Sequence, residues 1–191
     1  MSGDGLTLFS AQGAGAAGVG SVLVFSNDSD TWNFRAEITV TGGVDNGVDS
    51  EIPISTNNLG SMVAFGGETT YIYFGSGSSW AEDEQISITG AQTNRTNVSI
   101  NYDGNMLVTS GYVGAGFVQN QVEIFTRAGG AWSLEKTYQT LGEYDSKFGY
   151  SLYAYPDGSG AIVGAYQDDP NLAVFDNPGR GTVTFIKAEV L

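Results

Sequence analysis

The sequence predicts an all-β protein, a β-propeller of about four four-stranded blades, some of them incomplete. Two observations lead to this fold class. Trp32, Trp80 and Trp132 recur about every fifty residues, and each follows a phenylalanine that closes a short apolar run. Asp-Gly pairs such as Asp103-Gly104 separate short apolar runs, which is a strong signal for a β-hairpin. Four short strands in a unit of roughly forty to fifty residues are typical of a propeller blade, and a β-sandwich is the alternative.

Each unit is expected to hold four strands in a fixed order. The second strand follows the Asp-Gly turn, the third ends at the phenylalanine, and the fourth follows the tryptophan. The first unit begins at its second strand and the last ends after its third, so about fourteen strands are expected. The units form a single domain over 1–191 and are expected at about 1–43, 50–90, 96–140 and 147–191.

Aromatic residues that recur at the same place in each unit are the candidates for the core. The phenylalanines that close the third strands, with Phe185 in the last unit, are expected to be buried equivalents. The tryptophans are expected to pack between neighbouring blades rather than to stack on sugars. The candidate repeat core consists of Phe25, Trp32, Phe74, Trp80, Phe125, Trp132 and Phe148.

Three segments of the last unit resemble a known repeat. Residues 145–152, DSKFGYSL, are similar to the opening of the FG-GAP repeat of integrin-α propellers and of many secreted, bacterial and viral proteins. Residues 161–165, AIVGA, and 181–185, GTVTF, resemble the two strands that follow in that repeat. Each motif is short, so the resemblance implies a propeller fold far more strongly than it implies a function.

The FG-GAP resemblance also implies calcium loops, but no unit carries the D-x-D-G-x-D run of that family intact. The nearest acidic loops hold Asp45 with Asp49, and Asp168 with Asp169, which are the candidate calcium ligands. Calcium needs about six to eight converging oxygen atoms. Turn formation explains the same residues without a metal. The sequence therefore predicts no cofactor and keeps calcium as the alternative.

Composition and net charge exclude several classes of function. The chain has 21 acidic and 7 basic residues, and its net charge of −14 repels nucleic acid. It contains no Cys and no His, which removes disulfides, zinc sites, thiol nucleophiles and Ser-His-Asp triads. The arginines are scattered through the units, and the paired carboxylates of Glu82 and Glu84 suit the edge of an outer strand. On these grounds the chain is expected not to be an enzyme.

The two incomplete end units form the candidate interaction surface. Unpaired strand edges are templates for another chain, and native proteins rarely leave them uncovered. Either the chain closes as a small four-bladed ring, or other chains complete it in a homo-oligomer or a larger assembly. The expected interface residues are Leu6, Leu8 and Phe9 in the first unit, and Val183, Phe185, Ile186 and Val190 in the last.

The favoured function is a structural or interaction propeller without catalysis, plausible as a capsid- or tail-associated protein of a bacteriophage virion. An acidic, glycine-rich and cysteine-free β protein suits a particle that is released by lysis. Residues 1–5 carry no signal-peptide pattern, and no apolar run is long enough to span a membrane. The expected location is the virion or the medium after lysis. The alternative is a glycan- or receptor-binding adhesin that uses loops on one propeller face.

Overall fold

The described part of the chain consists of β-strands and of the turns that join them. The structure is a computed structural model that describes residues 1–12, 19–41, 52–66, 69–88, 97–113, 119–139, 148–165 and 181–188. Within these residues fourteen strands pair in antiparallel fashion to form four sheets. The prediction of an all-β chain is confirmed.

The four sheets follow one another along the chain, and consecutive strands pair within each of them. Among the described residues, the first and last sheets have three strands and the two middle sheets have four. The first sheet holds β1 (Thr7–Gln12), β2 (Val19–Asp28) and β3 (Thr31–Thr41); the second holds β4 (Ile54–Thr56), β5 (Met62–Phe65), β6 (Thr70–Ser76) and β7 (Ser79–Ile86); the third holds β8 (Asn97–Ile100), β9 (Met106–Val113), β10 (Gln119–Ala128) and β11 (Ala131–Gln139); the last holds β12 (Ser151–Ala154), β13 (Gly160–Ala165) and β14 (Thr182–Lys187).

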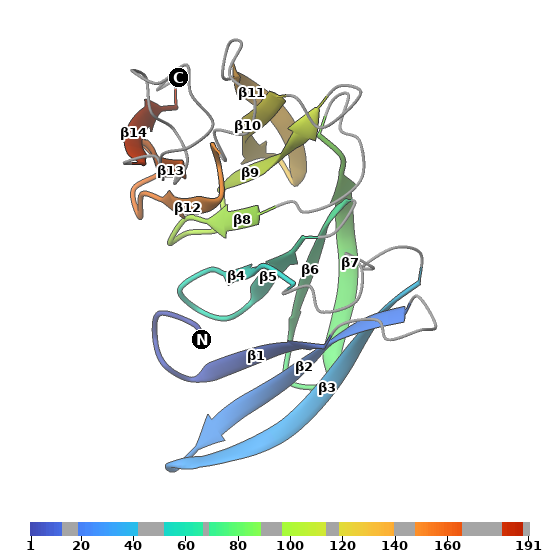
Figure 1. The fold of residues 1–191 in the computed structure, drawn as a ribbon. Coiled ribbons are helices and arrows are strands. Elements are labelled where there is room, and N and C mark those ends of the chain that lie inside the picture. Colours follow the sequence, from blue (N-terminus) through green and yellow to red (C-terminus); the bar gives the residue numbers. More distant parts are fainter. Residues whose placement is uncertain are drawn as a thin grey trace.

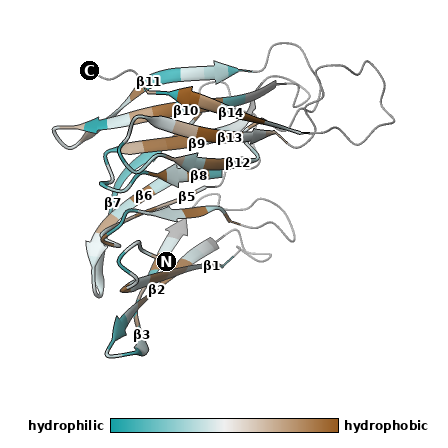
Figure 2. Cartoon of the chain, turned by 90° about the vertical axis from the view of Figure 1, so that its left-hand side faces the viewer, coloured by the Kyte–Doolittle hydropathy of each residue, from teal (hydrophilic) through white to brown (hydrophobic). Residues whose placement is uncertain are grey.

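The sheets stack face to face in a curved row, which gives the chain a propeller-like architecture (Figure 1). The innermost described strands β1, β4, β8 and β12 lie on the concave side of the row, and β3, β7 and β11 lie away from it. The first sheet occupies one end of the row and the last sheet the other. The stacked strands carry most of the hydrophobic residues, while the turns are mostly hydrophilic (Figure 2).

A turn with the same hydrogen bonds precedes the second strand of every unit. A glycine in this turn donates its amide to the carbonyl three residues earlier, at 3.0 to 3.2 Å. The backbone of these glycines has a positive φ, which a residue with a side chain adopts only with strain. The turn glycines are Gly5, Gly60, Gly104 and Gly158. Because this turn recurs, residues of different units can be matched by their distance from its glycine.

A β-bulge also falls at the same place in the first three sheets. The register between the third and fourth strands shifts immediately before Phe25, Tyr73 and Phe125. Tyr73 is therefore the equivalent of the two phenylalanines, and the expectation that Phe74 takes this position is wrong. The strand register, which a bulge alters by one residue, decides equivalence here, whereas residue type was the only signal in the sequence. The fourth strands also begin before the tryptophan, so that Trp32 lies within β3.

The last sheet differs from the expectation in the same way. Ile186 pairs with Ala161 as Phe125 pairs with Leu107, and Ile186 is buried against the third sheet. Phe185 is 69% exposed, so the expectation that it is buried is wrong. Successive side chains of a strand point to opposite faces, and an offset of one residue therefore moves a side chain from the core to the surface.

Three clusters of buried hydrophobic side chains fill the spaces between neighbouring sheets. One joins the first sheet to the second and includes Phe9 and Phe65. The next joins the second to the third and includes Ile72 and Phe125. The cluster between the third and last sheets includes Ile124, together with Phe148. The row is therefore held together by contacts between adjacent sheets.

Candidate functional site: the two end faces of the sheet row

Each sheet has two faces, which we name by their direction along the row. The leading face points toward the next sheet in the chain, and the trailing face toward the previous one. The residue four positions after the turn glycine lies on the leading face and pairs with a residue of the third strand on the same face. These leading-face pairs are Phe9 with Val24, Ala64 with Ile72, Val108 with Ile124, and Ile162 with Phe185.

The leading face is covered in three sheets and open in the last. Val24, Ile72 and Ile124 are 0 to 1% exposed, whereas the equivalent Phe185 is 69% exposed. Val183 is 63% exposed, although its equivalents in the earlier sheets are fully buried. The last sheet therefore presents to solvent an apolar surface of the kind that the other sheets bury against a neighbour.

The trailing face shows the converse arrangement, because the first sheet has no sheet before it in the described chain. Leu8 and Phe25 are half-buried, while their equivalents in the other three sheets are buried. Phe34 extends this surface and meets Phe25 edge-on, with ring centroids 5.8 Å apart. Trp32 is 40% exposed, whereas the equivalent Trp132 is 8% exposed. Both ends of the row are thus apolar and open.

The equivalent tryptophans show what a covered trailing face does. Trp132 donates its indole N–H to Asp83 Oδ2 at 3.2 Å, and its backbone N–H to Glu84 at 3.3 Å. Arg127 forms an ion pair with Asp83 at 3.1 Å. Two of the acidic residues at 82–84 thus bind the next sheet, a role that their sequence did not indicate.

Trp80 contacts the preceding sheet in a different way. Its ring meets Phe9 of the first sheet edge-on, with centroids 5.4 Å apart. The indole N–H of Trp80 donates to the carbonyl of Gly77 in its own turn, at 3.1 Å. A tryptophan at this position can therefore bind the neighbouring sheet through its ring alone.

Serines on the inner strands make a second repeated contact between sheets. Ser55 Oγ of β4 accepts the N–H of Ile100 at 3.0 Å, and Ser99 Oγ of β8 accepts the N–H of Ala154 at 2.9 Å. Both serines lie two residues before the first residue of the shared turn. The last sheet has Tyr153 at this position, and its side chain is 54% exposed.

The shared turns are also joined from sheet to sheet. Asp4 donates its amide to the carbonyl of Asn58, and Asn58 donates its own amide to the carbonyl of Tyr102, both at 3.0 Å. A β-carbon at Gly60 would lie 2.6 Å from the Thr7 side chain, which is too close for non-bonded atoms, so the absence of a side chain allows this close approach. Hydrogen bonds therefore join neighbouring sheets both along the inner strands and at the turns.

Titratable groups with shifted pKa values belong to this framework. Burial, together with the hydrogen bond to Glu82 at 3.0 Å, raises the pKa of Tyr73 to about 12. Hydrogen bonds from the Ser2 hydroxyl and the Leu6 amide lower the pKa of Asp4. Hydrogen bonds from Ser159 do the same for Asp157 in the equivalent turn. In each case the groups that shift the pKa belong to the strands and turns of this framework.

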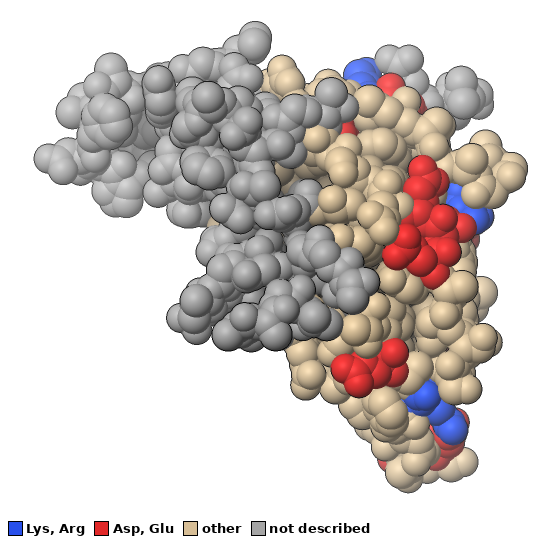
Figure 3. Space-filling view, turned by 90° about the vertical axis from the view of Figure 1, so that its right-hand side faces the viewer, with Lys and Arg blue, Asp and Glu red and all other residues tan. Residues whose placement is uncertain are grey.

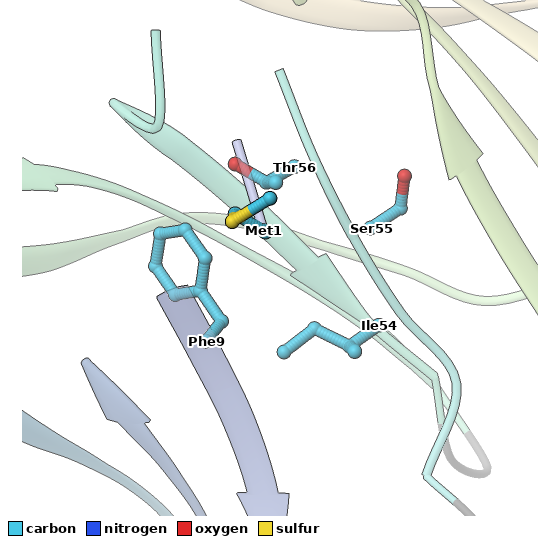
Figure 4. Close-up of a pocket in the computed structure, with 5 residues that line it drawn as sticks. All are labelled: Met1, Phe9, Ile54, Ser55 and Thr56. Atoms are coloured by element: carbon cyan, nitrogen blue, oxygen red, sulfur yellow. The ribbon is translucent and has the colours of Figure 1, made fainter. Parts of the chain in front are cut away.

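A pocket opens between the first and second sheets, beside the inner strands (Figure 4). It has a volume of about 190 Å³, and its lining residues are Met1, Phe9, Ile54, Ser55 and Thr56. Inner strands pack against each other further along the row, β4 against β8 and β8 against β12. Between the first two sheets, the pocket is lined by Phe9 of β1 and by the three residues of β4.

One buried polar group was not foreseen from the sequence. Glu123 of β10 is fully buried and accepts a hydrogen bond from Gln121, which in turn accepts one from Gln139. Nearby on the strand ladder, the Thr109 hydroxyl lies 3.1 Å from that of Thr70 on the second sheet. The signal in the sequence was a polar residue at an apolar position of a strand. These polar side chains lie at the interface between the second and third sheets, away from the shared turns.

Charge is distributed unevenly over the surface. Acidic side chains gather in separate patches on the face that carries β7 (Figure 3). In the described segments the cations of Arg35 and Arg127 both pair with acidic residues, Asp28 and Asp83. No group of three acidic residues among the described positions could hold a metal ion. No described helix is long and apolar enough to cross a membrane.

The predicted site residues have different outcomes. Leu6, Val183 and Phe185 are exposed, and Leu8 is half-buried. Phe9 and Ile186 are 6% and 3% exposed and pack against neighbouring sheets, so their assignment to an outer interface is corrected. The candidate calcium ligands Asp45, Asp49, Asp168 and Asp169, and the interface candidate Val190, lie outside the described residues.

Comparisons with known proteins bear on the fold. No family model and no curated protein sequence matches the chain. Among solved structures it resembles a putative 6-phosphogluconolactonase from Bacteroides fragilis, with 11% identity and a TM-score of 0.50 over 95% of this chain and 58% of that one. TolB from Acinetobacter baumannii matches at 12% identity and a TM-score of 0.44, over 97% of this chain and 44% of that one. An acylaminoacyl peptidase from Pyrococcus horikoshii matches at 9% identity and 0.45, over 95% of this chain and 31% of that one.

These likenesses correct one prediction and leave another as it was. The expectation that the chain is not an enzyme is contradicted at the level of the fold, because the solved structure that it resembles at a TM-score of 0.50 is a putative 6-phosphogluconolactonase. The absence of His and Cys did not justify so broad an exclusion, since carboxylates alone can catalyse hydrolysis. At 11% identity the likeness to the first of these structures shows a propeller-like fold alone. The chain spans 58%, 44% and 31% of the three structures. The FG-GAP resemblance stays a prediction.

Proposed function

We propose that this chain is a β-propeller module of four blades whose open end faces bind other protein chains, and that it is a structural component of a bacteriophage virion. The observation that carries the proposal is the exposure of Val183 and Phe185. These side chains are 63% and 69% exposed at positions where earlier sheets bury their equivalents against a neighbour. A partner that covered them would repeat a contact that the chain already makes three times.

The energetics of burial support a protein partner. Removing apolar surface from water stabilises a complex by roughly 25 cal/mol per Å². Leu8 and Phe25 at one end, and Phe185 at the other, offer such surface on β-strands. Among the described residues, the inner edge of β1 and the outer edge of β14 have no partner strand, so a further strand could pair with either edge.

The virion part of the proposal rests on composition. The chain has no Cys, so its folding needs no oxidising compartment. Its charge of −14 and its 28 glycines fit a soluble, turn-rich β protein that assembles after synthesis. A glycan-binding role on the loop face is the competing proposal, and it does not require the end faces to be covered by a partner.

Cysteine labelling tests the proposal without knowledge of the partner. Because the chain has no Cys, the variants Val183→Cys and Leu134→Cys each carry one thiol. Leu134 lies on the outer strand β11, away from the end faces, and is 47% exposed. Thiols react with a maleimide only where they are accessible. In the natively assembled protein the thiol at 183 should react at least about tenfold more slowly than the thiol at 134.

The unfolded chains supply the reference for this experiment. In denaturant the two thiols should react at similar rates, which shows that the difference comes from the assembly. Equal rates under native conditions would overturn the proposal, because the last sheet would then be open in the working protein. A loop-face binding role would then become the better account.

A further inference from the structure

We propose that the two end faces bind each other between copies of this chain, so that copies associate head to tail. The leading face of the last sheet of one copy packs on the trailing face of the first sheet of a second copy. This inference rests on the proposed function, in which the end faces bind proteins, and it names the partner. The three interfaces inside the chain supply the physical argument.

The first step is the match of apolar positions. Inside the chain, a leading face always packs on a trailing face, as Ile124 of the third sheet packs in one cluster with Ile186 of the last. The last sheet offers Phe185 at the position of Ile124. The first sheet offers Phe25 at the position of Ile186. A second copy therefore presents the same kind of surface that this face binds elsewhere.

The second step concerns size at the inner strands. Ser55 and Ser99 are small, and each accepts a hydrogen bond from the inner strand of the following sheet. The last sheet has the larger Tyr153 at this position. Tyr153 pairs with Ile162 on the leading face and is 54% exposed. Its ring therefore adds to the surface that the last sheet offers to a second copy.

The third step concerns the exposed tryptophan of the first sheet. Trp80 packs its ring against Phe9, which lies on the leading face four residues after the turn glycine. The residue at the same position of the last sheet is Ile162. Trp32 would meet Ile162 of a second copy in the same way. This contact would cover a tryptophan that is 40% exposed in the single chain.

The two faces belong to different sheets and lie apart in the described chain. The first and last sheets lie at opposite ends of the curved row (Figure 1). Two different faces that bind each other make a heterologous interface, which yields a ring when the rotation closes and a filament when it does not. The curvature of the row favours a closed ring of a small number of copies.

Two single variants test the arrangement by complementation. Trp32→Lys blocks the first face, and Phe185→Lys blocks the last. Both side chains are exposed, so the charge should leave the fold intact, which circular dichroism checks. We expect the unaltered chain to have the mass of two or more copies by light scattering at roughly 100 μM. Each variant alone should have the mass of one chain. An equimolar mixture should have the mass of two chains, because the intact last face of one variant can bind the intact first face of the other.

The other outcomes each overturn the inference. A symmetric contact between two last faces would leave the Trp32→Lys variant associated, and a contact between two first faces would leave the Phe185→Lys variant associated. A mixture that stays monomeric contradicts a head-to-tail interface. The control Leu134→Lys, placed on an outer strand, should keep the mass of the unaltered chain. An unaltered chain that is monomeric, while the thiol of the Val183→Cys variant is protected in the native assembly, would refute this inference and leave the proposed function standing.

Discussion

The third and last sheets place similar residues at equivalent positions, yet one is covered and the other is open. Ile124 and Phe185 occupy the same place on the leading face, and only Ile124 is buried. The local strand register is the same in both sheets. Whether a side chain is buried at this position therefore depends on the presence of a neighbouring sheet and not on the residue type. A sheet becomes part of the core when another sheet covers it.

The same contrast appears between the trailing faces of the first and third sheets. Trp132 is bound by Asp83 and Glu84 of the preceding sheet, whereas Trp32 has no preceding sheet in the described chain. Comparison of equivalent substitutions in covered and open sheets therefore isolates the contribution of the interface. The following predictions apply to the monomeric chain at low concentration.

The largest difference is expected between Ile124→Ala and Phe185→Ala. Truncation of a buried isoleucine leaves a cavity and should lower the free energy of unfolding by about 2–5 kcal/mol. Truncation of the exposed phenylalanine should change it by less than about 1 kcal/mol. Urea denaturation followed by tryptophan fluorescence measures both values. Equal losses would show that the last face is already covered in the monomer.

The serine contact should give the next largest effect. In Ser99→Ala, the N–H of Ala154 loses its acceptor inside the interface. A buried N–H without a partner should lower the free energy of unfolding by about 1–3 kcal/mol. Tyr153→Ala changes the equivalent position in the last sheet and should have an effect within about 0.5 kcal/mol. Amide hydrogen exchange at Ala154 provides a second measurement, with faster exchange expected in Ser99→Ala alone.

The equivalent tryptophans Trp132 and Trp32 allow a third comparison between a covered and an open sheet. Trp132→Phe removes the hydrogen bond to Asp83 while it keeps an aromatic ring in the interface. This variant should lower the free energy of unfolding by about 1 kcal/mol. Trp32 has no preceding sheet in the described chain to supply such a carboxylate, so Trp32→Phe should change the free energy of unfolding very little. Thermal denaturation of both variants tests this, and a larger loss in Trp32→Phe would contradict the assigned roles.

A dependence of stability on alkaline pH is also expected. Tyr73 has a pKa of about 12 in the folded chain, against 10.0 for the free side chain. The neutral phenol is therefore favoured by folding, and its contribution is complete below pH 10 and lost as the pH rises toward 12. Tyr73→Phe should flatten the fall in stability over this interval. Urea midpoints measured between pH 9 and about 12 test the prediction, and parallel curves would contradict it.

Several features of the fold could be predicted from the sequence because they are local. The turn glycines predicted the hairpins, because a tight turn needs a residue with positive φ and glycine adopts it most easily. The spacing of the tryptophans indicated the repeat, and the alternation of apolar residues indicated strands. Equivalence across units was predicted less well. Phe74 was matched to Phe25 by residue type, while the bulge places Tyr73 there.

The candidate site shows where sequence reasoning ends. Strands, turns and the order of the units can be predicted from the sequence, because they depend on residues close together in the chain. The burial of Phe9 and Ile186 and the exposure of Val183 and Phe185 depend instead on how the sheets pack. The tertiary structure also showed that Asp83 binds Trp132 of the next sheet. The physical reason is that both faces of a strand can be equally apolar, and only the presence of a neighbouring sheet determines which one is shielded from water.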